Sequence, residues 1–96
     1  FNNYQSKVGK VDLNDVIYPY YLSLNMLDVP GQMLKFTQIM TQIGASFSRI
    51  VQTSTDGQTA RVVIITHEMS KVQLHDLKQQ LLAVDTMSLL AAYKVL

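Results

Sequence analysis

Apolar side chains occupy every second position between residues 20 and 26, at Tyr20, Leu22, Leu24 and Met26. A period of two residues is typical of a strand with one buried face. After the segment Asp28-Val29-Pro30-Gly31 the period changes, and apolar residues recur at steps of three and four over residues 33–43. This spacing predicts an amphipathic helix. Pro30 suits the first helical position, and Gly44 suits the cap at the carboxyl end.

A second strand is predicted over residues 45–53, and Asp56-Gly57 then favours a tight hairpin turn within residues 55–58. The third strand, residues 60–66, is apolar on both faces, with Val62 and Ile64 on one face and Val63 and Ile65 on the other. A strand of this kind is usually central and covered on both sides. In the fold predicted below, the second strand lies at a sheet edge beside the third.

The remaining pattern predicts one more helix and one more strand. Ser70 and Gln73 have the spacing of a capping box. One helix face then carries Leu74, Leu77, Leu81 and Val84. The break at Asp85-Thr86 precedes a last strand over residues 88–96. The order strand, helix, strand, strand, helix, strand is that of the ferredoxin-like α+β sandwich, a four-stranded antiparallel sheet with two helices on one face.

Residues 1–18 have no clean period and are predicted to form a connector from a preceding region outside this chain, with a short strand around residues 16–18. The ordered domain is predicted to cover residues 19–96. A chain of 96 residues suffices for one domain. Only 16% of the residues are charged, which indicates that a partner covers part of the surface.

Charge and composition exclude several classes of partner. A net charge of +1 gives no field that would gather nucleic acid or anionic lipid. The sequence has no apolar run long enough for a membrane span, no visible signal peptide and no cysteine. We therefore expect no nucleic-acid or membrane partner and a cytoplasmic location.

Candidate chemistry is sparse as well. The four glycines are too scattered for a nucleotide-binding loop, and His67 and His75 are not spaced as a metal-binding pair. No nucleophile motif is present. We expect no catalytic residues, no metal site and no cofactor in this chain. The third strand lacks the aromatic residues of an RNA-recognition motif, and the first loop lacks the paired cysteines of a metal carrier and the arginine of an acylphosphatase.

The loop Asp28-Val29-Pro30-Gly31, followed by an apolar helix, Gly44 and a hairpin, resembles the signature of ACT domains. Two further segments, residues 19–24 (PYYLSL) and 61–70 (RVVIITHEMS), are similar to the ACT domain that closes many homoserine dehydrogenases. The resemblance covers residues 19–96. It implies a parent enzyme that reduces aspartate semialdehyde to homoserine in threonine and methionine biosynthesis, with NAD(P) bound in the region preceding this chain.

The resemblance also implies an amino-acid effector, with threonine favoured, and a homodimer through ACT–ACT pairing. The expected effector-binding residues are Asn25, Leu27, Asp28, Val29, Pro30, Gly31, Gln32 and Met33. Val29 stands where the family commonly has a basic residue, and Gln32 stands where it usually has a small or aliphatic one.

Two interpretations of the loop are physically open. Free N–H groups at the helix N-terminus can receive a carboxylate, while Asp28 or Asn25 holds an ammonium group. Alternatively, Asp28 only caps the helix, and Pro30 and Gly31 only shape the turn. A purely structural ACT dimerisation domain and a free-standing ACT regulator are the alternative functions.

Overall fold

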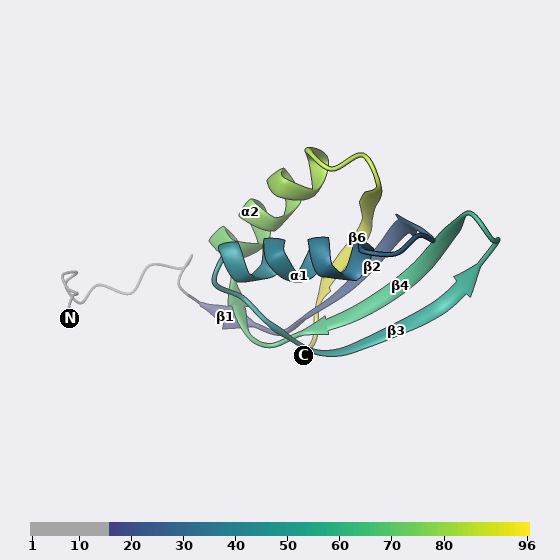
Figure 1. The fold of residues 1–96 in the computed structure, drawn as a ribbon. Helices are drawn as coiled ribbons and strands as arrows, with labels where there is room; N and C mark the ends of the chain where they lie inside the picture. The colour runs from purple at the N-terminus through teal and green to yellow at the C-terminus, as the bar shows by residue number, and fades with distance from the viewer. Residues whose placement is uncertain (1–15) are drawn as a thin grey trace.

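The computed structural model describes residues 16–96, which form an antiparallel sheet with two helices on one face (Figure 1). The sheet order is β3-β4-β2-β6, comprising β2 (Tyr20–Leu27), β3 (Phe47–Thr55), β4 (Thr59–Thr66) and β6 (Met87–Lys94). The helices are α1 (Gln32–Gln42) and α2 (Lys71–Leu82). This arrangement confirms the predicted ferredoxin-like class, with β3 at an edge beside β4.

A second, two-stranded sheet pairs β1 (Ile17–Tyr18) with β5 (Met69–Ser70). The short strand predicted around residues 16–18 is therefore present, and it lies against the segment that leads into α2. The predicted connector otherwise falls on residues 1–15, which are outside the described residues. Neither helix in residues 16–96 is long and apolar enough to cross a membrane.

The core lies between the helices and the inner face of the sheet. Alternation places every second side chain of β2 and β4 on that face. The largest fully buried side chains come from β2, β4, β5 and both helices: Leu22, Leu24, Ile64, Thr66, Met69, Phe36, Met40 and Leu77. In α2 the predicted apolar face is confirmed for Leu74, Leu77 and Leu81, of which the last two are buried. Val84, predicted to continue this face, lies just after the helix and packs against the core.

Strand β4 is central, as predicted, but the prediction that both its faces are covered is wrong. Val62 and Ile64 are buried beneath the helices, whereas Val63 and Ile65 are only half-buried on the outer face. Both helices of this chain lie on the same side, so nothing in residues 16–96 forms a layer over the outer face (Figure 1).

Helix α1 begins after the position predicted from Pro30, which was expected to be the first helical residue. Its N-cap is Gly31, at φ 91°, so Pro30 precedes the cap and does not occupy the first helical position. The carboxyl end agrees with the prediction: Gly44 adopts φ 75°. The N–H of Gly44 donates to the carbonyl of Thr41 at 3.0 Å, and that of Ala45 donates to Met40 at 2.9 Å. This pair of bonds is the Schellman motif.

The capping box of α2 is present and extends to the other helix. The Ser70 hydroxyl accepts from the N–H of Gln73 at 3.1 Å, and Gln73 Oε1 accepts from the N–H of Ser70 at 2.8 Å. Gln73 Nε2 also donates to the carbonyls of Ile43 and Gly44, at 3.1 and 3.0 Å. One side chain thus satisfies backbone groups at the end of α1 and the start of α2.

The β3–β4 turn occupies residues 56–58, with Gly57 at φ 89°. Asp56 Oδ1 accepts from the N–H groups of Thr59 and Gln58, at 2.8 and 2.9 Å. These two bonds to the ionised carboxylate lower the pKa of Asp56, with the larger effect from Thr59. Several strand boundaries differ by one or two residues from the sequence prediction: β3 runs from Phe47 to Thr55, β4 begins at Thr59, and β6 runs from Met87 to Lys94.

Candidate functional site

A hollow of about 400 Å³ lies where β2 ends and α1 begins. One wall is the loop between these elements, together with the first turn of α1. The other wall is the inner face of β3 and β4. Its lining residues are Met26, Leu27, Asp28, Val29, Pro30, Gly31, Gln32, Met33, Ile50, Gln52, Ala60 and Val62.

The N-terminus of α1 opens toward this hollow. The first-turn amides receive no side-chain cap from residues 16–96, and the first turn contains no acidic residue. A Cβ on Gly31 would meet no atom of these residues within 4 Å, so they leave the space beside Gly31 open. The unpaired N–H groups and the helix dipole make such a terminus a receptor for a carboxylate or another anion.

Gln32, the first residue of α1, is a polar side chain buried in the wall of the hollow. Only 6% of it is exposed, and its Oε1 has no hydrogen-bond partner among the described residues. An unsatisfied buried acceptor costs roughly 1–3 kcal/mol. A donor entering the hollow would remove that cost, so the oxygen is a potential contact for a ligand N–H or O–H group.

Asp28 does not cap α1, so the interpretation of this residue as a cap is wrong. Its Oδ2 accepts a hydrogen bond from the Thr55 hydroxyl at 3.0 Å, and its backbone N–H donates to the Gln58 carbonyl at 2.8 Å. Both bonds tie the loop to the β3–β4 turn. The carboxylate stays exposed at the rim of the hollow, where its second oxygen can accept from a ligand.

The structure brings together all but one of the residues predicted from the sequence. Leu27, Asp28, Val29, Pro30, Gly31, Gln32 and Met33 line the hollow. Asn25 does not line it, because strand alternation directs this side chain to the outer face of the sheet, in register with Arg61 and Ser88. Asn25 therefore lies apart from the other predicted residues, and its contact with an ammonium group stays a prediction.

The opposite wall was not predicted from the sequence. Ile50 and Gln52 on β3, and Ala60 and Val62 on β4, complete the hollow together with Met26. The strand order places β4 beside β2 and β3 beside β4, and the pairing of Ile50 with Ile64 puts Ile50 on the inner face. The alternation of side chains along each strand could have indicated which residues face the hollow. In β3, however, two bulges change which positions face inward, so the alternation could not be read from the sequence.

Other chemistry-bearing side chains are dispersed. Within residues 16–96, no three histidine or acidic side chains are grouped so that they could hold a metal ion. His67, directly after β4, and His75, on α2, are both exposed.

Comparison with solved structures identifies the fold. The ACT domain of the GTP pyrophosphokinase from Chlorobium tepidum matches 83% of this chain over its own full length, with a TM-score of 0.55 at 15% identity. This chain has the fold of an ACT domain. A homoserine dehydrogenase from Thiobacillus denitrificans matches 93% of it with a TM-score of 0.72 at 19% identity, over 20% of the enzyme.

Sequence comparison relates this ACT domain to homoserine dehydrogenases. It is 33% identical over all 96 residues to the homoserine dehydrogenase of Lactococcus lactis subsp. lactis (strain IL1403), and 30% identical over 70 residues to that of Bacillus subtilis (strain 168). The match spans only 22% and 16% of those enzymes, and in the former it lies at the C-terminal end. No family model matches the chain.

Proposed function

We propose that this ACT domain is the amino-acid-responsive, dimer-forming regulatory part of a homoserine dehydrogenase. The observation that carries the proposal is the buried, unpartnered Gln32 oxygen beside the uncapped N-terminus of α1, in a hollow lined by the predicted effector loop. The similarity to two homoserine dehydrogenases supports the parent enzyme. Reduction of aspartate semialdehyde, and the NAD(P) site it needs, would belong to the region outside this chain.

The hollow offers separate contacts for each part of an α-amino acid. A carboxylate would accept from the first-turn amides of α1, where the helix dipole favours negative charge. The ammonium group would donate to Gln32 Oε1 and to the Asp28 carboxylate. A short side chain would then lie against Met26, Ile50 and Val62. Threonine suits this arrangement because its methyl group can contact the apolar wall while its hydroxyl reaches Gln52.

Pairing along β3 would complete the regulatory unit. This strand is an outer strand of the sheet, so one row of its backbone groups has no neighbouring strand within residues 16–96. Unpaired edges invite pairing, and β3 carries neither proline nor lysine that would oppose it. Because Ile50 and Gln52 belong to both this edge and the hollow, a β3–β3 homodimer would place the effector close to the subunit interface.

The test is calorimetric titration of the 96-residue chain with threonine, isoleucine, methionine and serine, repeated with Asp28→Asn. The variant keeps an acceptor for the Thr55 hydroxyl but loses the charge that would hold an ammonium group. A hydrogen bond to a charged group contributes about 1.5–3 kcal/mol, so binding should weaken roughly ten- to hundredfold. Asp76→Asn, on the exposed part of α2, is the matched control and should bind like the wild type.

Two results would contradict parts of this proposal. If none of the four amino acids binds at millimolar concentration, the effector role fails and a purely structural dimerisation domain remains. If Asp28→Asn binds as tightly as the wild type, the ammonium group is held elsewhere. A coding sequence without several hundred upstream codons would show a free-standing ACT regulator instead of a fused enzyme domain.

A further inference from the structure

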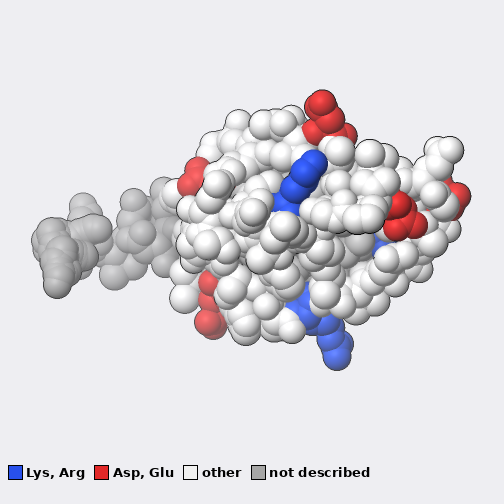
Figure 2. Space-filling view, in the orientation of Figure 1, with Lys and Arg blue, Asp and Glu red and all other residues white. Residues whose placement is uncertain are grey.

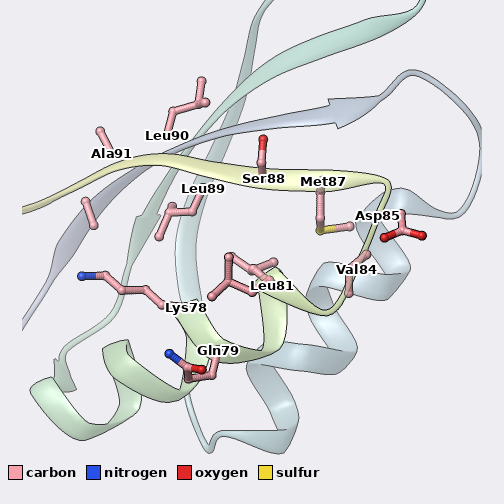
Figure 3. Close-up of a pocket in the computed structure, with 12 residues that line it drawn as sticks. Lys78, Gln79, Leu81, Val84, Asp85, Met87, Ser88, Leu89, Leu90 and Ala91 are labelled. Carbon is pink, nitrogen blue, oxygen red and sulfur yellow. The ribbon is translucent and has the colours of Figure 1, made fainter.

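A second hollow, of about 670 Å³, lies on the opposite side of the domain between α2 and the edge strand β6 (Figure 3). We call this the α2–β6 groove. Met87 and Leu89 point from β6 toward the helix, and Leu81 points from the helix toward β6 (Figure 3). The groove is therefore apolar along its centre, and it shares no lining residue with the hollow at α1.

A large apolar side chain beside this groove is exposed: Leu82, in the last turn of α2, is 79% exposed. Leu90, on β6, is 49% exposed, but its side chain points away from α2 (Figure 3). Leaving a leucine side chain in water forgoes roughly 1.5–3 kcal/mol of burial. Among the residues that line the groove, only Lys78 and Asp85 are charged, and on the face of the domain shown in Figure 2 the charged side chains are scattered. These features are typical of a surface that another protein covers.

Charged side chains mark the two ends of the groove. Lys78 lies at one end and Asp85 at the other, with Leu81 between them (Figure 3). Both are exposed. Helical spacing places Leu82 one turn after Lys78 on the same side of α2. Along the groove, a positive side chain is thus followed by apolar side chains and then by a negative one. This order is self-complementary, because a two-fold axis near Leu82 would place Lys78 of each copy beside Asp85 of the other.

From this pattern we infer that the α2–β6 groove binds a second copy of this chain, as an isologous contact distinct from pairing along β3. The contact is made by side chains and not by a continuous strand ladder. The register between β2 and β6 shifts between Ser23 and Leu24, whose partners are Ala91 and Leu89, so Leu90 is an additional residue in β6. Such a bulge disfavours addition of another strand, and it leaves Met87 and Leu89 directed toward α2 (Figure 3).

Charge reversal provides the test, measured by analytical ultracentrifugation of the 96-residue chain. In a dimer of Lys78→Glu, the new carboxylate of each chain faces Asp85 of the other chain, which gives two repulsive pairs. In a dimer of Asp85→Lys, the new ammonium group of each chain faces Lys78 of the other chain, which again gives two repulsive pairs. Each variant alone should weaken this contact about tenfold or more, with a smaller effect at high salt. An equimolar mixture of the two variants should restore association, because the carboxylate introduced at position 78 of one chain then meets the ammonium group introduced at position 85 of the other. The variant that carries both substitutions should restore it as well.

A single introduced cysteine reports on this contact independently of any pairing along β3, because the chain has no cysteine of its own. Leu82→Cys should form an intermolecular disulfide under mild oxidation. Val72→Cys, 52% exposed near the opposite end of α2, should not. The inference would be overturned if Leu82→Cys and Val72→Cys cross-linked equally. It would also be overturned if mixing the two charge variants did not restore association. Failure of amino-acid binding or of β3 pairing would leave these readouts unchanged.

Discussion

Gln32 combines a stability cost with a potential binding role. Its side chain is buried, and Oε1 lacks a partner among residues 16–96. Gln32→Met has nearly the same length and removes the polar oxygen. We expect the variant without ligand to be more stable by roughly 1–3 kcal/mol, measured by urea denaturation. The same variant should bind the amino acid more weakly by calorimetry, since it offers no acceptor. A loss of stability would show that the oxygen is satisfied in solution.

Sequence patterns around single residues predicted local structure well, but they predicted contacts between residues far apart in the chain poorly. Gly44 and the Ser70–Gln73 box were predicted correctly because a helix end depends on a few neighbouring residues. Asp28 was open to two interpretations because capping and ligand binding favour the same residue types. Its bond to Thr55 depends on a hairpin 27 positions away, which no local pattern contains. Asn25 was misplaced because proximity in sequence to the loop was given more weight than strand alternation.

At the scale of elements, Gln73 connects the two helices. It accepts from the N–H of Ser70 and donates to the carbonyls of Ile43 and Gly44. Each bond contributes about 0.5–1.5 kcal/mol. Gln73→Ala should therefore lower the free energy of unfolding by roughly 2–3 kcal/mol, and Ser70→Ala by about 1 kcal/mol. Gln38→Ala, at an exposed position of α1, is the control for a glutamine lost from a helix. Equal losses for Gln73 and Ser70 would mean that the link to α1 contributes nothing.

The order of elements, the sheet class and the edge position of β3 could all be predicted from periodicity and turn residues. The extent of β3 and the phase of its side chains could not. The register between β3 and β4 shifts twice, between Phe47 and Arg49 and between Gln52 and Ser54. The hydroxyls of Ser48 and Thr53 donate to β4 carbonyls at these irregularities. Each bulge reverses the alternation, so a simple period of two could not predict that Ile50 faces the hollow.

At the scale of the whole molecule, the exposed edge of β3 predicts self-association. Val51, 45% exposed on this strand, would lie close to the two-fold axis of a β3–β3 pair. Val51→Lys places like charges near each other and blunts the edge. We expect the dimer dissociation constant to rise about tenfold or more, measured by sedimentation. Val72→Lys, on exposed α2, should have a much smaller effect. A wild-type chain that stays monomeric at high micromolar concentration would contradict pairing along β3.

The presence of Ile50 and Gln52 in both the hollow and the β3 edge has a thermodynamic consequence. If an amino acid bound there favours the paired form, then pairing must raise affinity for that amino acid by the same factor, because the two equilibria are linked. Sensitivity to the effector would then depend on the concentration of the protein itself. Dilute subunits would respond weakly to an amino-acid level that strongly affects abundant ones.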